Sequence, residues 1–243
     1  MKQNKKVAVV TGAFRGSGSQ ITNLLTKNNY KVYALDLNFK KTITEKYNLV
    51  SYKIDLSKFS EIKKFVKFLK KKETKVDCLV NNAGISLKKN ISNIEYYWKK
   101  TISVNLDAIF FISELLVPLL KKSKFPSIVN ISSISAKIAM SNNPAYNSSK
   151  AGVLALTSSQ AFDYSKYKIR SNTICPGYVK TNMTKKSFQN KNAKNKRENR
   201  LITKRFGTPN DISELVFFLC SQNSEYINGE DIVIDGGFLK KGI

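Results

Sequence analysis

The 243-residue sequence contains no histidine and only three cysteines. The absence of histidine excludes Ser-His-Asp and Cys-His catalysts, and it excludes zinc sites of the Cys/His type. Cys78, Cys175 and Cys220 are odd in number and far apart, and none forms a CxxC pair. This usage argues against a disulfide framework and for a reducing compartment. Any acid–base chemistry must therefore use other residue types.

Acidic residues are scarce: 17 Asp and Glu stand against 42 Lys and Arg, which gives a formal net charge of +25. Such an excess suits an anionic partner such as nucleic acid, an anionic membrane or a phosphorylated substrate. An A/T-rich genome explains it more simply, because lysine and asparagine are both abundant while arginine is rare. The lysines are also scattered, without interleaved aromatic residues, so we expect no nucleic-acid partner.

Long apolar runs are missing as well. No stretch approaches the roughly 18–20 apolar residues of a membrane span. The apolar run that follows the basic N-terminal residues is shorter than a signal peptide requires. We therefore predict a soluble, cytoplasmic protein without a membrane partner.

Short β-branched runs alternate with amphipathic segments of helical period. We predict strands at 6–10, 31–35, 50–54, 77–80, 127–131, 170–174 and 231–234, and helices at 16–28, 57–71, 97–120, 144–167 and 211–220. Such alternation gives βαβ units and a doubly wound parallel sheet with helices on both faces. We predict one α/β domain over residues 1–243, with the polar, lysine-rich segment 182–204 as a lid over the substrate.

The first predicted strand ends in VVTGAFRGSGSQI, with glycines at 12, 16 and 18. Glycine permits a tight turn and the approach of a pyrophosphate, which the N–H groups of the next helix then face; a purely structural turn is the alternative. Asp36 ends the second strand, where a carboxylate binds an adenosine ribose and repels a 2′-phosphate. Arg15, in contrast, suits a 2′-phosphate. We predict a dinucleotide site that prefers NAD, with NADP possible.

In the segment AYNSSK, Tyr146 and Lys150 lie one helical turn apart. A phenol can protonate a ketone, but its pKa of about 10 is too high for an easy base at neutral pH. A lysine ammonium one turn away would stabilise the tyrosinate and lower that pKa. The pair thus meets the residue-type requirement for acid–base catalysis without histidine.

Together with NNAG at 81–84, these features resemble the short-chain dehydrogenase/reductase family over the whole length of the chain. The matching segments are TGAFRGSG (11–18), Asp55, NNAG (81–84), Asn105 in SVNL, NISS (130–133), YNSSK (146–150), PGYVKT (176–181) and IDGG (234–237). Ser17 replaces a residue that is usually apolar, but its backbone N–H can still serve. The resemblance implies a Rossmann-type fold, an NAD(P)-dependent interconversion of alcohol and ketone, and a homotetramer.

The resemblance also implies roles for the catalytic residues. Tyr146 would be the acid–base residue, and Lys150 would also hold the nicotinamide ribose. Ser133, thirteen positions before Tyr146, would bond the substrate oxygen. On its motif position, Asn105 would hold a water that extends the proton relay; a bond to the backbone within its helix is the alternative.

Chemistry alone leaves Ser132 and Ser135 as alternatives to Ser133. The implied cofactor contacts are Gly12, Arg15, Gly16, Ser17, Gly18, Asp36, Asp55, Leu56, Asn82, Ala83, Gly84, Tyr146, Lys150, Pro176, Gly177, Val179 and Thr181. Among them, Asp55 and Leu56 would face the adenine. No metal site is expected.

The family fixes the reaction type but not the substrate. The expected NAD preference and the segment PGYVKTNMTKK favour a sugar, sugar-acid or polyol substrate. The alternative is a 3-oxoacyl-[acyl-carrier-protein] reductase, which usually uses NADPH; Lys124 and Lys166 would then meet an acidic carrier. A third hypothesis is a non-catalytic nucleotide- or nucleic-acid-binding protein, against which the intact Asn–Ser–Tyr–Lys set argues.

Overall fold

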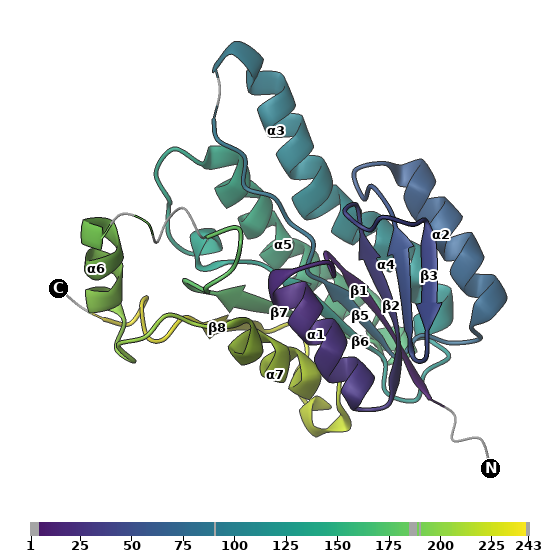
Figure 1. The fold of residues 1–243 in the computed structure, drawn as a ribbon. Coiled ribbons are helices and arrows are strands. Elements are labelled where there is room, and N and C mark those ends of the chain that lie inside the picture. Colours follow the sequence, from purple (N-terminus) through teal and green to yellow (C-terminus); the bar gives the residue numbers. More distant parts are fainter. Residues whose placement is uncertain (1–4, 90, 185–188, 190, 242–243) are drawn as a thin grey trace.

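The computed structural model describes residues 5–89, 91–184, 189 and 191–241. An eight-stranded sheet forms its middle layer, and helices cover both faces (Figure 1). The strands are β1 (Lys6–Thr11), β2 (Tyr30–Asp36), β3 (Ile43–Lys46), β4 (Leu49–Lys53), β5 (Cys78–Asn81), β6 (Ser127–Ile131), β7 (Arg170–Pro176) and β8 (Asp231–Ile234). The helices are α1 (Gly16–Lys27), α2 (Phe59–Lys72), α3 (Ile94–Ile102), α4 (Ala108–Leu120), α5 (Pro144–Asp163), α6 (Lys191–Arg200) and α7 (Pro209–Leu219).

The sheet has the order β3-β4-β2-β1-β5-β6-β7-β8, and its pairs are parallel except β3 against β4. This confirms the predicted α/β fold. The chain builds outward from β1 in one direction through β2 and in the other through β5. The strand order therefore reverses beside the carboxyl end of β1, which is where ligands bind in open α/β sheets.

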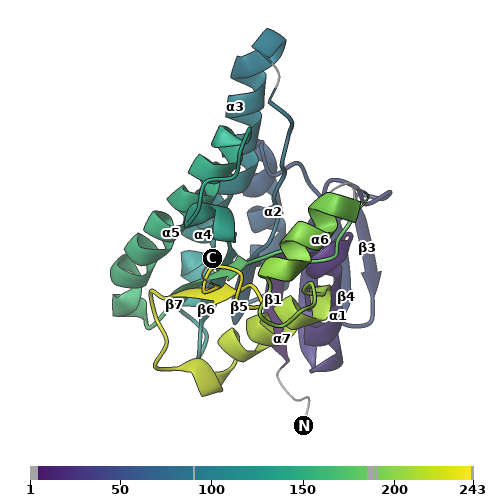
Figure 2. The same cartoon turned by 90° about the vertical axis from the view of Figure 1, so that its left-hand side faces the viewer.

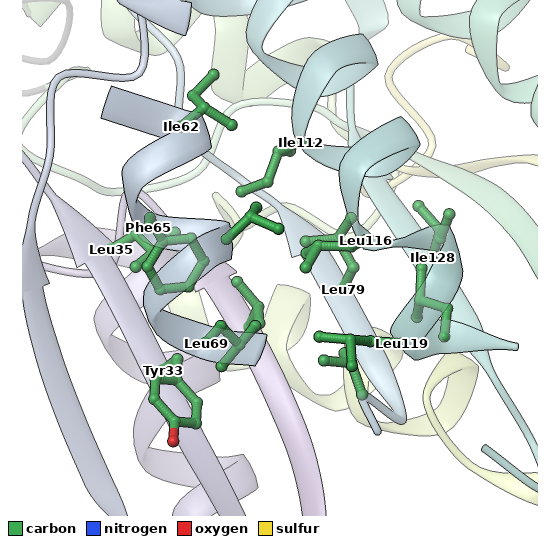
Figure 3. Close-up of a cluster of buried hydrophobic side chains, with 14 of the residues drawn as sticks. Tyr33, Leu35, Ile62, Phe65, Leu69, Leu79, Ile112, Leu116, Leu119 and Ile128 are labelled. Carbon is green, nitrogen blue, oxygen red and sulfur yellow. The ribbon is translucent and has the colours of Figure 1, made fainter. Parts of the chain in front are cut away.

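Two buried clusters hold the layers together, one on each face of the sheet. In β1, Val7 and Val9 belong to the cluster under α2 and α4, whereas Ala8 and Val10 belong to the cluster under α1 and α7. Successive side chains of a strand point to opposite faces, so a strand buried on both sides must be apolar throughout. Figure 3 shows the first cluster, in which Phe65 of α2 lies among side chains from the sheet and α4.

A buried polar network fixes α5 to the sheet. Asn130 of β6 donates from Nδ2 to Thr157 Oγ1 and to Gln160 Oε1, both at 2.9 Å. Thr173 of β7 donates to the same Thr157 hydroxyl at 2.7 Å. Because breaking such bonds would leave buried polar groups without partners, the network sets the height of α5 over the sheet.

The structure departs from the sequence prediction in three elements. Strand β3, which pairs with β4 as a hairpin, was not predicted because its exposed residues ITEK lack a buried face. Helix α6 was not predicted inside the polar segment 182–204. The long helix begins earlier than predicted, and a π-helical segment, Ser103–Asp107, separates α3 from α4. Single-turn π segments recur at functional sites.

The same long helix bears on the predicted absence of a membrane span. By length and composition alone, the continuous helical run Ile91–Leu120 is apolar enough to cross a membrane, since its most apolar 18-residue window has a mean hydropathy of 1.7. The sequence prediction did not anticipate a segment that meets this criterion. Within this run, 39% of the most apolar 18-residue window is buried inside the described chain, and a core helix of a soluble protein meets the same criterion.

The expectation of no disulfide is also wrong. Cys78 on β5 and Cys220 after α7 are joined by a disulfide, with their Cα atoms 5.8 Å apart, whereas Cys175 is free and buried. The two partners are separated by 142 residues, and only the packing of α7 against the sheet brings them together. The argument for a reducing compartment from cysteine usage loses its support.

Helix α7 begins with a capping box that closes the turn after residue 207. Asp211 Oδ2 accepts a hydrogen bond from the Thr208 N–H at 2.7 Å, and Thr208 Oγ1 accepts from the Asp211 N–H at 3.4 Å. Arg205 donates to both carboxylate oxygens of Asp211, each at 2.8 Å. These donors hold the pKa of Asp211 well below its usual value, chiefly through the Arg205 hydrogen bonds.

Substituting Asp211→Asn is expected to lower the free energy of unfolding by about 1 kcal/mol at neutral pH. Because the pKa of Asp211 is lower in the folded chain, its contribution is fully present above the unfolded pKa of about 4 and declines as the pH falls. Urea unfolding of both proteins should show a difference that shrinks below about pH 4. Glu95→Gln, in the exposed pair with Lys99, is the control. A difference that grows on acidification contradicts the prediction.

Candidate active site

A cavity of about 360 Å³ opens at the carboxyl ends of the parallel strands. It is lined by these predicted site residues: Gly12, Arg15, Ser17, Gly18, Asp36, Asp55, Leu56, Asn82, Ala83, Gly84, Ser133, Tyr146, Lys150, Pro176, Gly177, Val179 and Thr181. Gly16 and Asn105 lie just behind this lining. One cavity thus brings together residues that come from six strand ends.

The glycine turn is shaped by close backbone approach. Gly12 has a φ of +66°, and a Cβ placed on it would lie 2.8 Å from Ala83 Cα. A Cβ on Gly18 would lie 2.0 Å from the Gly12 carbonyl oxygen, so neither position accepts a side chain. Arg15 stands at the N-cap of α1 without a capping side-chain bond, which leaves helix N–H groups facing the cavity. These residues fit a pyrophosphate.

Asn82 ties the turn to β5. Its Nδ2 donates to the carbonyl oxygens of Thr11 at 3.0 Å and Gly12 at 3.1 Å. In return, Thr11 Oγ1 accepts from the N–H groups of Asn82 and Ala83, both at 3.0 Å. The sequence predicted Asn82 as a cofactor contact, and the structure shows that it also fixes the shape of the turn.

Asp36 presents its carboxylate at the same cavity from the end of β2. Oδ2 accepts from the Phe14 N–H at 3.1 Å, and Oδ1 accepts from the Asn38 N–H and Nδ2, both at 2.8 Å. The acid is thus held toward the glycine turn by neutral donors. A negative charge fixed there opposes the burial of a second one nearby.

Lys150 and Tyr146 project from the first turns of α5 toward β6. Lys150 Nζ donates to the Ile131 carbonyl oxygen at 2.8 Å and lies 5.8 Å from the centre of the Tyr146 ring. Burial lowers the pKa of Lys150 to about 8, and the nearby Cys175 only partly opposes this shift. Lys150 can therefore release its proton more readily near physiological pH than an exposed lysine can.

The pKa of Tyr146 differs from the sequence expectation. Burial raises it, and a hydrogen bond with Ser133 offsets only part of this shift. We expected Lys150 to lower the pKa of the phenol, and that is not the net result. The buried lysine has itself lost affinity for its proton, so its stabilisation of a tyrosinate is weak. A neutral phenol is the form that donates a proton.

The three neighbouring serines have different partners. Ser132 is buried, and its Oγ donates to the Lys150 carbonyl oxygen at 2.8 Å. The Ser135 hydroxyl donates to Ser133 Oγ at 2.8 Å, and the Ser135 N–H donates to the same oxygen at 3.1 Å. Of the three serines, Ser133 lines the cavity and is the one that bonds Tyr146 among the described residues. Ser132 also lines the cavity, but its hydroxyl is bound to α5.

Asn105 lies in the π-helical segment and is fully buried. Its Oδ1 accepts from the Ile85 N–H at 2.8 Å, and its Nδ2 donates to the Ile85 carbonyl at 2.9 Å and to Ser149 Oγ at 3.0 Å. These bonds reach the segment after β5 and helix α5 rather than its own helix. The side chain thus joins the two segments that carry the site.

The far side of the cavity is formed by the segment after β7. Gly177 is required there because a Cβ would lie 2.7 Å from Asp235 Cβ. Thr181 packs on the turn at Gly16 and accepts from Thr184 through its carbonyl. Part of the predicted lid, residues 185–188 and 190, lies outside the described residues. In the rest, α6 lies beside the C-terminal segment (Figures 1 and 2), where Arg200 stacks 4.2 Å from the Phe238 ring centre.

Some lining residues were missed by sequence reasoning. They are Leu37, Asn38, Ile54, Ile85, Lys100, Val104, Ile131, Asn182, Met183 and Thr184. Most lie next to a predicted residue on the same strand end or loop. Lys100 differs from these, since it reaches the cavity from α3 and belongs to none of the sequence motifs.

The predicted carrier contacts, Lys124 and Lys166, are not near the cavity. Lys124 precedes β6 and Lys166 precedes β7, so both lie at the amino ends of these parallel strands. The cavity opens at the carboxyl ends. Within one chain, these lysines therefore lie at the opposite edge of the sheet from the cavity.

Comparison with known proteins agrees with this geometry. A family model described as Enoyl-(Acyl carrier protein) reductase matches residues 12–239. The chain is 35% identical to the 3-oxoacyl-[acyl-carrier-protein] reductase FabG of Buchnera aphidicola, covering 98% of both chains. It is 31% identical to an NAD-dependent glycerol dehydrogenase of Listeria innocua, covering 97% of this chain and 94% of the relative.

Solved structures give the same picture. The aldohexose dehydrogenase of Thermoplasma acidophilum superposes with a TM-score of 0.88 at 30% identity, covering 98% of this chain and 95% of the other. A 4-hydroxyisoleucine dehydrogenase complexed with NADH gives 0.90 at 30% identity, covering 98% and 100%. The chain therefore belongs to the short-chain dehydrogenase/reductase family, and it is an oxidoreductase that acts on CH–OH groups.

Proposed function

We propose that this enzyme interconverts a secondary alcohol and a ketone on a sugar, sugar acid or polyol, with NAD as the preferred cofactor. The observation that carries the proposal is the carboxylate of Asp36, held at the cavity that also contains Tyr146, Lys150 and Ser133. The whole chain, residues 1–243, would serve as one dinucleotide-binding and catalytic domain.

The residues around the cavity have complementary tasks in this reaction. The nicotinamide, when bound, supplies or accepts the hydride. In ketone reduction, the neutral Tyr146 phenol donates its proton to the substrate oxygen, and Ser133 supplies a second hydrogen bond to that oxygen. Lys150 would hold the nicotinamide ribose, and its ammonium would return a proton to Tyr146. Asn105 acts as a positioning residue, because its side chain fixes Ile85 against α5.

The cofactor choice follows from electrostatics at the end of β2. A 2′-phosphate beside Asp36 would place two anions close together, at a cost larger than an exposed arginine returns. Two relatives carry the same cofactor in their descriptions, an NAD-dependent glycerol dehydrogenase and a dehydrogenase complexed with NADH. We infer from these observations that NAD is preferred over NADP.

The second candidate is a 3-oxoacyl-[acyl-carrier-protein] reductase, which the 35% identity to FabG of Buchnera aphidicola favours. Initial rates with aldohexoses, gluconate and glycerol should be compared with rates on a 3-oxoacyl thioester, each with both cofactors. The absorbance of the reduced nicotinamide reports every reaction. Turnover of the thioester with strong NADPH preference would replace the sugar or polyol proposal by the second candidate.

Substituting Tyr146→Phe is expected to lower kcat by about 10² to 10⁴, because the proton donor is lost while the ring remains. Cofactor affinity, measured by quenching of nicotinamide fluorescence, should change little. Tyr226→Phe, at a fully exposed position, is the matched control. Full turnover by Tyr146→Phe would refute the mechanism, and a wild-type chain without turnover on any substrate would favour the non-catalytic hypothesis.

Substituting Asp36→Ser is expected to raise the ratio of kcat/KM for NADP to that for NAD by about tenfold or more, which corresponds to about 1.4 kcal/mol. The change removes the charge that repels a 2′-phosphate and keeps a hydroxyl for the ribose. Asp163→Asn, exposed at the end of α5, controls for a general change in net charge. A wild-type enzyme that already prefers NADP would contradict the assignment.

We further propose a homotetramer in which α4 and α5 pack across subunits. Both helices expose large apolar side chains, with Phe110 43% and Phe162 82% exposed. Light scattering should give about four times the chain mass of 27.4 kDa. Phe162→Asp should shift the protein to smaller species, whereas Tyr226→Asp should not. A wild-type monomer would contradict the proposal.

A further inference from the structure

One basic side chain reaches the cavity from outside the motifs that define the site. Lys100, on the last turn of α3, lines the cavity together with Asp55, which follows β4. Its Nζ lies 3.6 Å from Asp55 Oδ2, and the two side chains are only 28% and 17% exposed. A lysine held this far out of water usually has a specific partner.

Ser57 connects Lys100 to Asp55 by hydrogen bonds that run in one direction. Lys100 Nζ donates to Ser57 Oγ at 2.6 Å, and Ser57 Oγ donates to Asp55 Oδ1 at 2.7 Å. An ammonium has no acceptor, so the single hydroxyl proton of Ser57 must point to the carboxylate. The Ser57 N–H donates to the same Oδ1 at 3.0 Å. The lysine therefore orients the serine, and the serine orients the acid.

This arrangement leaves the two carboxylate oxygens of Asp55 in different states. Oδ1 accepts two hydrogen bonds from Ser57, whereas Oδ2 has only the ion pair with Lys100 among the described residues. Burial alone would raise the pKa of Asp55, but the Ser57 bonds and the charges of Lys100 and Lys58 hold it below its usual value. Oδ2 is thus an ionised acceptor with capacity for a ligand donor.

We propose that Lys100 is a positioning residue for purine recognition, which acts through Ser57 to fix Asp55 so that Oδ2 accepts the 6-amino group of adenine. This inference rests on the proposed dinucleotide function of the cavity. Asp55 makes the contact with the purine, and Lys100 fixes the orientation of the Asp55 carboxylate. The consequence is selectivity for a 6-amino purine, because the 6-oxo group of hypoxanthine would present an acceptor to an acceptor.

The test compares the binding of NAD and of nicotinamide hypoxanthine dinucleotide, which differ at purine position 6 and in the proton that hypoxanthine carries on N1. In Lys100→Met the serine hydroxyl and the carboxylate are no longer fixed. The Kd for NAD is expected to rise about tenfold, the scale of one charged hydrogen bond. The Kd for the hypoxanthine analogue should change less than about twofold.

The neighbouring residues supply controls. Lys99→Met removes a charge of the same sign from the outer face, where Lys99 pairs with Glu95, and should leave both constants unchanged. Lys100→Arg keeps a cationic donor and should retain most of the preference for NAD. If Lys100→Met does not fold, Ser57→Ala interrupts the same chain and should also reduce the preference.

The preference of Lys100→Met for NAD over the hypoxanthine analogue decides the proposal. A reduced preference supports it. An unchanged or an increased preference overturns it. If both constants rise equally, Lys100 stabilises the cavity without recognising the purine. A wild-type chain that bound neither dinucleotide would instead overturn the proposed function, and this inference with it.

Discussion

The site depends on the hydrogen bonds that join the ends of β1 and β5. The side chain of Asn82 holds the carbonyls of Thr11 and Gly12, and Thr11 holds the backbone after β5 in return. At this point the strand order reverses: the chain continues from β1 toward one edge of the sheet, and from β5 toward the other edge. Without this tie, the glycine turn would lack a fixed distance to α5. The anion-binding end and the proton-donating end of the cavity are thereby kept in register.

The proton-donating end depends on burial. Two side chains of α5 form this end. One is a lysine whose pKa is lowered to about 8, and the other is a tyrosine whose pKa is raised. Their shifts have the same main cause, the removal of water, and they favour the neutral tyrosine and a readily released lysine proton. That combination suits reduction of a ketone at neutral pH. Oxidation of an alcohol needs a tyrosinate, which the positive charge of an oxidised nicotinamide would favour.

Sequence patterns predicted the elements that show a regular hydrophobic period and the turn that only glycine can form. The central strands were predictable because burial on both faces demands apolar residues throughout, and the glycine turn because a Cβ on Gly12 or Gly18 has no room. Strand β3 and the π-helical segment around Asn105 were not, since the first buries no face and the second differs from an α-helix by one hydrogen-bond register. The pairing of Cys78 with Cys220 and the reach of Lys100 to Asp55 arise only from tertiary packing.

The net charge of the chain does not decide which nucleotide the cavity favours. Despite a formal charge of +25, the cavity presents two carboxylates, Asp36 at the end of β2 and Asp55 after β4. Among the described residues, the hydrogen bonds to Asp36 come from neutral donors, so its charge stays available to repel a phosphate. Asp55 has a cation beside it, so its charge is partly balanced and its remaining oxygen acts as a directed acceptor. Two acids on one surface thus differ in task because their partners differ.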